Sequence, residues 1–251
     1  MPATETQTES ALLGVYKPAG PAFVGGEGCE LIAEDGRRYL DFTAGIAVNA
    51  LGYGDPDVAD AIRTALDAGV IHTSNLFRTQ PAAELANWLA ESSFADRVFF
   101  CNSGAEANEG AIKFARRWAG EGKTEIIAFR GGFHGRTMGA LAATDRPAYQ
   151  EPFKPLMPGV VFCDVGDTAE VDRLLARGKT AAVIIEPLQA EGGVRAVPAE
   201  FLKALRYLCD EAGALLILDE VQCGLGRTGN LWAHQSAGIT PDLMKIGRAH
   251  V

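Results

Sequence analysis

The pattern of hydrophobic and polar positions predicts a chain of alternating strands and helices. The clearest strand is Leu215–Leu218, four large aliphatic residues bounded by polar ones, which is typical of a strand buried on both faces of a parallel sheet. It is followed by two carboxylates, Asp219 and Glu220. Ligands bind at the carboxyl ends of strands in open α/β sheets, so Asp219 lies where chemistry is expected. Taken alone, a helix cap or half of an ion pair is the commoner role for such a residue.

The rest of the chain continues this alternation. Residues Ala22–Leu40 alternate loosely, which predicts a small β-meander with turns at Gly25–Gly26 and Glu34–Gly36. Helices are predicted at Pro56–Ile71, Pro81–Ala90, from about Glu106, and at Pro198–Ala212, and further strands at Val98–Cys101, Glu125–Phe129, Val160–Cys163 and Ala181–Ile185. Five strands with helical crossovers predict an α/β fold in which helices flank a mostly parallel sheet.

Composition narrows the class of partner. The 251 residues are 47% hydrophobic and carry a net charge of −9, which argues against nucleic acid or an anionic membrane and favours a small molecule. Residues 1–12 are expected to be disordered, with neither a signal peptide nor a membrane anchor in the polar start. The five cysteines form no C-x-x-C pair and the four histidines show no metal-binding spacing. We therefore expect reduced thiols, a cytoplasmic location and no metal.

Two loops after predicted strands carry candidate chemistry. In Cys101–Glu106, Ser103 and Glu106 form a capping-box pattern, and Gly104 allows close backbone approach. The first N–H groups of such a helix bind phosphate, although a well-capped helix without a ligand is an equally good interpretation. In Gly131–Thr137, an aromatic ring at Phe133 and a guanidinium at Arg136 suit a planar, anionic ligand. A lone histidine such as His134 is more often structural than catalytic.

Two further loops are ambiguous. Glu191, between small residues after a strand, faces either a pocket or solvent. Residues Gly224–Gly229 match the dinucleotide fingerprint G-x-G-x-x-G. That fingerprint requires its first glycine at the strand end and a helix directly after it, and neither is predicted here. A glycine-rich loop beside a site is the better interpretation, and a dinucleotide-dependent oxidoreductase is a minor alternative.

These loops together resemble those of class III, ornithine-type, aminotransferases, which use pyridoxal 5′-phosphate (PLP). The resemblance extends from about Tyr16 to Met244, and is also carried by Leu40–Phe42, Gly45–Asn49 and His72–Phe77. It implies the type I fold of PLP-dependent transferases and a homodimer. It also implies residues 13–50 as a segment contributing to a small domain, and 51–244 as a partial large PLP-binding domain.

The resemblance also implies roles for individual residues. Asp219 would pair with the ring nitrogen of PLP and keep it protonated, which makes the cofactor an electron sink. The cofactor phosphate would be bound by Ser103, Gly104 and Ala105. Phe133 would stack on the ring, and Gln222 would bond the ring hydroxyl. Arg136 would bind a substrate carboxylate. Glu191 would help one pocket accept both an amino donor and 2-oxoglutarate.

The implied reaction is transamination of N-acetylornithine with 2-oxoglutarate in arginine biosynthesis. Succinylornithine, ornithine and 4-aminobutyrate are alternative donors, and a non-catalytic PLP-fold protein is an alternative class. Small departures from the family pattern are Ala190 for glycine and Tyr53 for histidine.

The larger departure lies near the end of the sequence. The Schiff-base lysine is expected at position 248, which is Arg248, and Lys245 is three residues early. We interpret residues 245–251 as a non-native tail, encoded by a sequencing-library adapter, on an incomplete gene product. The chain is therefore expected to lack the Schiff-base lysine and to be inactive alone.

Overall fold

The structure is a computed structural model, and it describes residues 11, 13–16, 20–69, 72–74 and 76–247. The described residues form two compact units. One comprises those up to residue 69, and the other those from residue 72 onward. The predicted boundary between residues 50 and 51 stays a prediction.

The first unit contains the predicted meander. Strands β1 (Phe23–Glu27), β2 (Glu30–Ala33) and β3 (Arg38–Leu40) pair antiparallel in that order. The turn at Glu34–Gly36 is confirmed, but the turn predicted at Gly25–Gly26 is wrong. Both glycines lie inside β1 and pair with β2, and the chain reverses at Gly28, whose φ of +56° suits a tight hairpin.

Two helices follow the meander in this unit. A short helix α1 (Ala44–Ala47) precedes α2 (Pro56–Asp67), which Asp55 caps by accepting from Val58 N–H at 3.0 Å. Helix α2 ends at Asp67, four residues before the predicted end at Ile71. Residues 70–71 of that prediction lie outside the described residues. Tyr53, where the family pattern has histidine, donates its hydroxyl to Asp41 at 2.6 Å.

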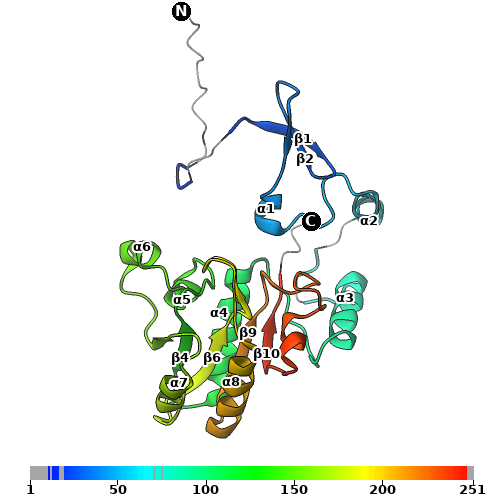
Figure 1. The fold of residues 1–251 in the computed structure, drawn as a ribbon. Coiled ribbons are helices and arrows are strands. Elements are labelled where there is room, and N and C mark those ends of the chain that lie inside the picture. The colour runs from blue at the N-terminus through cyan, green and yellow to red at the C-terminus, as the bar shows by residue number, and fades with distance from the viewer. Residues whose placement is uncertain (1–10, 12, 17–19, 70–71, 75, 248–251) are drawn as a thin grey trace, which may run out of the picture. The chain divides into compact units, whose positions relative to one another are not determined.

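The second unit is built on a five-stranded sheet in the order β10-β9-β6-β4-β5, with every neighbouring pair parallel (Figure 1). The strands are β4 (Glu125–Phe129), β5 (Val160–Cys163), β6 (Thr180–Ile185), β9 (Leu215–Asp219) and β10 (Leu243–Lys245). Four of these were predicted. The strand predicted at Val98–Cys101 is wrong, because that segment forms no ladder with any described strand, and Phe99 is 63% exposed.

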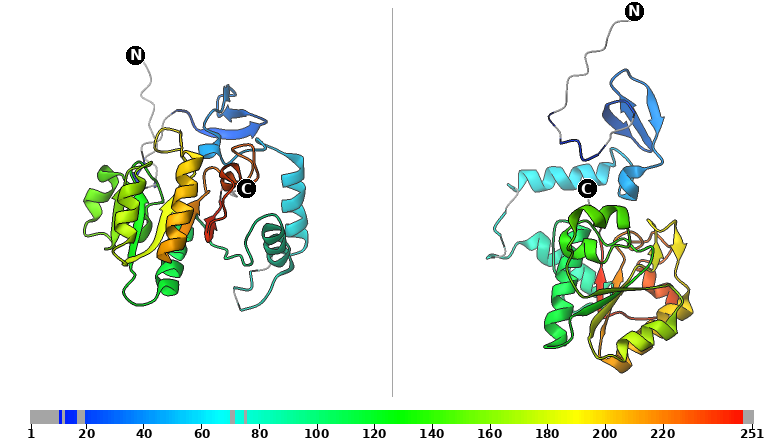
Figure 2. Two further views of the ribbon diagram at one scale, coloured as in Figure 1. Left: turned by 60° about the horizontal axis from the view of Figure 1, so that its bottom comes forward. Right: turned by 90° about the vertical axis from the view of Figure 1, so that its left-hand side faces the viewer.

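Helices cover both faces of this sheet (Figures 1 and 2). Helices α7 (Thr168–Leu175) and α8 (Ala199–Ala212) pack on one face, and α4 (Gly104–Ala119) packs on the other. Successive side chains of a strand point to opposite faces: Ile127 and Phe129 point to α7 and α8, whereas Ile126 and Ala128 point to α4. Burial on both faces explains the continuous aliphatic runs in the sequence.

Helix α4 buries only part of its hydrophobic stripe. The helical spacing of Ala107, Ala111, Phe114, Ala115 and Trp118 predicts one buried face, and Ala111 and Ala115 are buried, but Phe114 and Trp118 are about half exposed. The buried side instead includes Asn108 and Ile112. Asn108 breaks the hydrophobic pattern because it serves the polar cluster described below.

The remaining elements are short, apart from α3 (Gln80–Glu91), which matches its prediction. They are α5 (Met138–Ala142), α6 (Pro147–Gln150), the 3-10 helices η1 (Glu151–Phe153) and η2 (Ala233–Ala237), and the hairpin β7 (Leu188–Gln189) with β8 (Arg195–Ala196). Among the described residues, none of the helices has the length and hydrophobicity to cross a bilayer. All five cysteines are free.

Candidate active site

The candidate site lies at the carboxyl edge of the parallel sheet. The loop after β4 carries Phe133 and His134, β6 is followed by Glu186, and β9 and β10 end at Asp219 and Lys245. Because parallel strands end at the same edge, residues separated by more than a hundred positions come together there.

Asp219 is the centre of a buried polar cluster. Its carboxylate is 4% exposed. Oδ2 lies 2.7 Å from His134 Nδ1, 2.7 Å from Lys245 Nζ and 3.1 Å from Asn108 Nδ2, and Oδ1 accepts from Val221 N–H at 3.2 Å. The carboxylate therefore has four polar partners, three at Oδ2 and one at Oδ1.

These partners keep Asp219 ionised. Burial alone would raise its pKa, but Lys245 and His134 outweigh burial and hold the pKa of Asp219 well below its ordinary value. Burial lowers the pKa of His134, an effect that Asp219 opposes. The cluster thus presents a negative carboxylate supported by an imidazole, which is suited to pairing with a cationic ligand.

Asn108 and His134 are held firmly around this carboxylate. The Asn108 amide donates to the carbonyls of His134 and Gly104, and Thr144 Oγ1 accepts from His134 N–H at 2.8 Å. The Lys245 ammonium is also buried and makes a short contact with Asn108 Oδ1. Burial lowers the pKa of Lys245, against the pull of Asp219.

The start of α4 lies beside this cluster. Ser103 Oγ accepts from Glu106 N–H at 3.2 Å, which confirms the predicted cap, while the Glu106 carboxylate accepts from Asn102 N–H at 2.6 Å. The N–H groups of Gly104 and Ala105 belong to the first turn and have no intrahelical partner. A Cβ added to Gly104 would lie 3.0 Å from Val221 Cγ1, so this turn packs closely against the segment after β9.

Gly135 brings the loop after β4 against the same turn. Its φ is +125°, and an added Cβ would lie 2.8 Å from Ala105 Cβ. Phe133 is half-buried in this loop, and its N–H donates to Glu186 Oε1 at 2.8 Å. Burial, reinforced by Asp219, raises the pKa of Glu186 to about 8.

The other predicted residues lie in more exposed positions. The Arg136 guanidinium is exposed and stacks on the Tyr149 ring, 4.4 Å from its centroid. Glu191 is exposed in the β7–β8 hairpin, and its carbonyl accepts from Arg146. Gln222 is half-buried in the turn after β9.

Glu220, the neighbour of Asp219, points elsewhere. It is fully buried and accepts from Ala233 N–H at 2.6 Å and His234 N–H at 2.8 Å, and it contacts His234 Nδ1 at 2.9 Å. It therefore anchors η2. The Gly224–Gly229 segment consists of turns without a helix, so the structural context of the dinucleotide fingerprint is missing.

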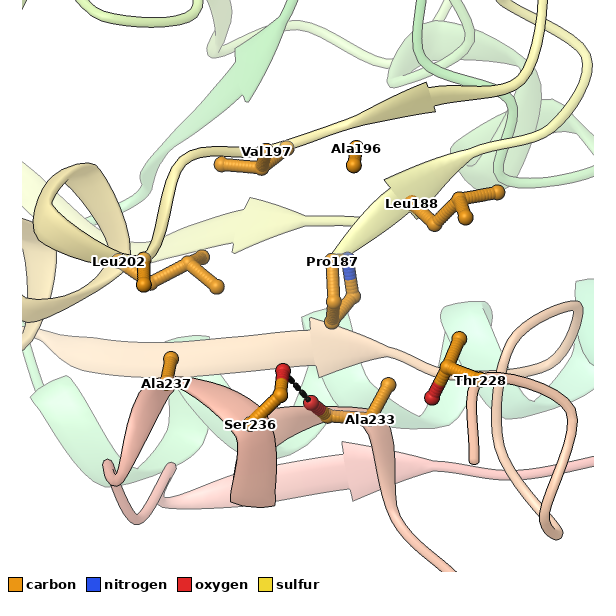
Figure 3. Close-up of a pocket in the computed structure, with 10 residues that line it drawn as sticks. Pro187, Leu188, Ala196, Val197, Leu202, Thr228, Ala233, Ser236 and Ala237 are labelled. Atoms are coloured by element: carbon orange, nitrogen blue, oxygen red, sulfur yellow. Dashed lines mark hydrogen bonds between the residues drawn. The ribbon is translucent and has the colours of Figure 1, made fainter. Parts of the chain in front are cut away.

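A small apolar cavity of about 170 Å³ lies between the β7–β8 hairpin, the start of α8 and η2 (Figure 3). Pro187, Val197 and Leu202 contribute to its wall, and Ser236 Oγ there donates to the Ala233 carbonyl at 2.8 Å. Because its lining residues carry no charge, it does not suit an anionic cofactor. Among the described residues, no group of histidine, cysteine or carboxylate side chains forms a metal site.

The family model for class III aminotransferases matches residues 18–250. The chain belongs to the class III aminotransferases. This class and its solved structural neighbours are PLP enzymes.

Curated relatives agree with this assignment. The chain is 50% identical over 244 residues to the mitochondrial acetylornithine aminotransferase of Alnus glutinosa. This match covers 94% of this chain and 54% of that protein. It is 46% identical over 241 residues to the acetylornithine aminotransferase of Methanocaldococcus jannaschii, covering 94% and 60% respectively. The chain thus spans a little over half the length of the relatives it matches.

Solved structures show that the fold is that of the class III aminotransferases. The ornithine aminotransferase of Toxoplasma gondii, whose structure has partial occupancy of PLP at the active site, matches with a TM-score of 0.89 and 30% identity, over 95% of this chain and 57% of that one. The N-acetylornithine aminotransferase of Stenotrophomonas maltophilia K279a matches with a TM-score of 0.79 and 40% identity, over 92% and 59%.

The class III site in this chain fits PLP in most respects. The first turn of α4 offers N–H groups for a phosphate, and Asp219 offers a buried carboxylate for a protonated ring nitrogen. Lys245 is the exception, because its ammonium already lies on that carboxylate. The sequence pattern predicts no role for Lys245, Asn108 or Glu186. For Asn108 the sequence does contain an indication, because it is a polar residue on the buried side of a helix.

Proposed function

We propose that this chain is the PLP-binding part of an aminotransferase for N-acetylornithine. The observation that carries the proposal is the buried carboxylate of Asp219 at the end of β9, supported by His134 at 2.7 Å and lying beside the first turn of α4. The identity of 45–50% to acetylornithine aminotransferases supports this donor over succinylornithine, ornithine and 4-aminobutyrate.

Each proposed cofactor residue has a physical task. The N–H groups at Ser103, Gly104 and Ala105 bind the phosphate with help from the α4 dipole. Asp219 holds a proton on the ring nitrogen, His134 and Asn108 orient Asp219, Phe133 packs on the ring, and Gln222 binds the ring hydroxyl. When bound, PLP supplies an electron sink at the carbon that carries the transferred amino group.

We propose further that Arg136 binds a substrate carboxylate and that Glu191 lets one pocket alternate between the amino donor and 2-oxoglutarate. Both residues lie on exposed loops after strands of the site edge. A homodimer and a cytoplasmic location are also parts of this proposal. The family pattern places the lysine that forms the covalent link to PLP at position 248, where this sequence has Arg248. That position lies outside the described residues.

The test has two parts. The 251-residue chain should bind PLP, and Asp219→Asn should weaken that binding. The complete gene product, read from the native locus past the codon of Met244, should contain a lysine–glycine pair there and should convert N-acetylornithine and 2-oxoglutarate faster than the three alternative donors.

Other results would point to other functions. If the native frame lacks a lysine and the protein binds PLP without turnover, a non-catalytic PLP-fold protein replaces this proposal. If one of the other donors gives the highest kcat/KM, the donor assignment fails while the transaminase class stands.

A further inference from the structure

Glu109 is a half-buried carboxylate on α4 that the proposed function does not use. Its Oε1 atom accepts three hydrogen bonds from the segment after β4. The donors are the Thr137 hydroxyl at 2.6 Å, the Gly139 N–H at 2.7 Å and the Ala140 N–H at 3.1 Å. These donors lie 28 to 31 positions further along the chain. The carboxylate therefore connects α4 to a separate segment.

The same carboxylate caps the start of α5. Thr137 is the N-cap residue of α5, but its own side chain makes no capping hydrogen bond. The first N–H groups of a helix have no intrahelical partner. Here the N–H groups of Gly139 and Ala140 donate to Glu109, which does for α5 what an N-cap side chain does elsewhere. Helix α4 thus fixes where α5 begins.

Arg136 lies directly before the anchored Thr137. On its other side, the Gly135 carbonyl oxygen lies 3.0 Å from Thr144 Oγ1, which is buried. The backbone is therefore held on both sides of Arg136, by Thr144 and by Glu109. The Arg136 side chain itself is exposed, so the direction of its guanidinium depends on the backbone from which it starts.

Gly139 leaves the space that the Glu109 carboxylate fills. Gly139 is buried, and an added Cβ would lie 3.0 Å from Glu109 Cδ and closer still to Glu109 Oε2. The atoms in the way belong to the end of a flexible side chain. An alanine at this position should therefore push the carboxylate away from its three donors and leave the backbone in place.

We propose that Glu109 is a positioning residue: by anchoring Thr137 and the start of α5 to α4, it sets the direction from which Arg136 meets a substrate carboxylate. Arg136 enters here in its proposed role as the carboxylate clamp, on which this inference rests. A bidentate pair between guanidinium and carboxylate requires the two groups to be aligned. A looser backbone therefore weakens substrate binding, and the expected signature is a raised KM with little change in kcat.

The test measures steady-state kinetics of the complete gene product, with the amino donor that gives the highest kcat/KM. Glu109→Ala removes the acceptor and should raise the KM for 2-oxoglutarate about 10-fold, with kcat within about twofold of the wild type. Glu109→Gln keeps a carbonyl oxygen for the same donors, so its KM should stay within about threefold of the wild type. Gly139→Ala displaces the carboxylate without removing it and should resemble Glu109→Ala.

A double-mutant cycle shows whether Glu109 acts through Arg136. In the Arg136→Lys background the bidentate pair is already lost, so adding Glu109→Ala should raise the KM by no more than about a further twofold. Glu211→Ala, at an exposed position of α8, is the matched control and should leave the KM unchanged. If circular dichroism shows that Glu109→Ala does not fold, Thr137→Val replaces it in the cycle. It removes only the hydroxyl donor, and its KM should rise about threefold.

The outcomes distinguish a failure of this inference from a failure of the clamp. If Arg136→Lys raises the KM but Glu109→Ala does not, or if the two increases multiply in the double variant, the positioning role is wrong and the clamp stands. A fall in kcat of Glu109→Ala at unchanged KM would also overturn the positioning role. If Arg136→Lys itself leaves the KM unchanged, the clamp assignment is wrong, and the positioning role is wrong with it.

Discussion

Asp219 Oδ2 and His134 Nδ1 lie 2.7 Å apart although 85 residues separate them, and both side chains are almost completely buried. The imidazole orients the carboxylate, and the carboxylate selects the ring tautomer. The adjacent carboxylate, Glu220, shares neither partner and anchors η2 instead. Two consecutive acidic residues thus have separate tasks, which mutations can distinguish.

Asp219→Asn should reduce the affinity for PLP by about 10- to 100-fold, because a charge-assisted hydrogen bond to the ring nitrogen becomes a neutral one. It should also destabilise the fold by about 3–5 kcal/mol, since the Lys245 ammonium loses its buried counter-charge. Dialysis and urea unfolding measure the two effects. Asp172→Asn, on the exposed face of α7, is the matched control and should change neither. Unchanged PLP affinity in Asp219→Asn would remove this residue from the cofactor site.

Glu220→Gln should show the opposite profile. The carboxylate accepts two backbone N–H groups and contacts His234 from a fully buried position, so losing the charge should cost about 2–4 kcal/mol of unfolding free energy. PLP affinity of the folded fraction should stay within about threefold of the wild type, because none of these partners belongs to the Asp219 cluster. A loss of affinity equal to that of Asp219→Asn would contradict the separation of roles.

The fold was predictable where the sequence pattern reports burial. Leu215–Leu218 is buried on both faces, as its continuous run of aliphatic residues predicts. Val98–Cys101 has the same apolar pattern but forms no ladder, because a strand also needs a neighbour, and neighbours are not encoded locally. Strand β10 is the opposite case, a strand that the sequence pattern does not predict. Leu243–Lys245 is too short to show a periodic pattern, but it pairs with β9.

The site was predictable in its loops but not in its contacts. Phe133 follows β4 and Asp219 ends β9, so the parallel topology brings these two residues to one edge. Ser103 follows no strand in the structure and caps the start of α4. The side-chain partners of Asp219 come from residues 108, 134 and 245, and no spacing rule relates these positions. Lys245 stands three residues before the family position of the lysine, so the family pattern predicts no role for it, yet the end of β10 directs its ammonium onto Asp219.

Glu186 should make stability depend on pH. Its pKa in the folded protein is about 8, above the ordinary 4.5, so the folded state holds a proton that the unfolded state releases between these values. The stability contribution is fully present below about pH 4.5 and declines as the pH rises towards 8, with a slope of up to about 1.4 kcal/mol per pH unit.

Urea unfolding of the wild type and Glu186→Gln between pH 5 and about 8 tests this linkage. The glutamine keeps an oxygen for the Phe133 N–H but does not titrate, so its stability should fall less steeply than that of the wild type. Glu200→Gln removes an exposed carboxylate and should follow the wild-type slope. Parallel slopes for wild type and Glu186→Gln would mean that Glu186 is ionised in the folded state.

Gly135→Ala should loosen the contact between the loop after β4 and α4. The added methyl meets Ala105 at 2.8 Å in a backbone with φ of +125°, and clash and strain together should cost about 2–4 kcal/mol. Gly122→Ala is the matched control, because its φ is +90° but an added Cβ meets nothing within 4 Å. It should cost only the strain, about 1–2 kcal/mol. Equal costs for the two variants would show that the close approach to Ala105 is not limiting.

Arg136 and Tyr149 test the substrate side of the proposal. The guanidinium stacks on the ring at 4.4 Å, which holds a planar fork in an exposed position where a carboxylate can reach it. In the complete enzyme, Arg136→Lys should raise the KM for 2-oxoglutarate by about 10-fold or more, because lysine cannot form the bidentate pair. Tyr149→Leu should raise it by a smaller factor of about 2–5, since the stacking energy is modest at an exposed site. Tyr149→Phe keeps the ring and should match the wild type. If Arg136→Lys lowers kcat with KM unchanged, the residue acts on the reaction step and not on carboxylate binding, and the clamp assignment is wrong.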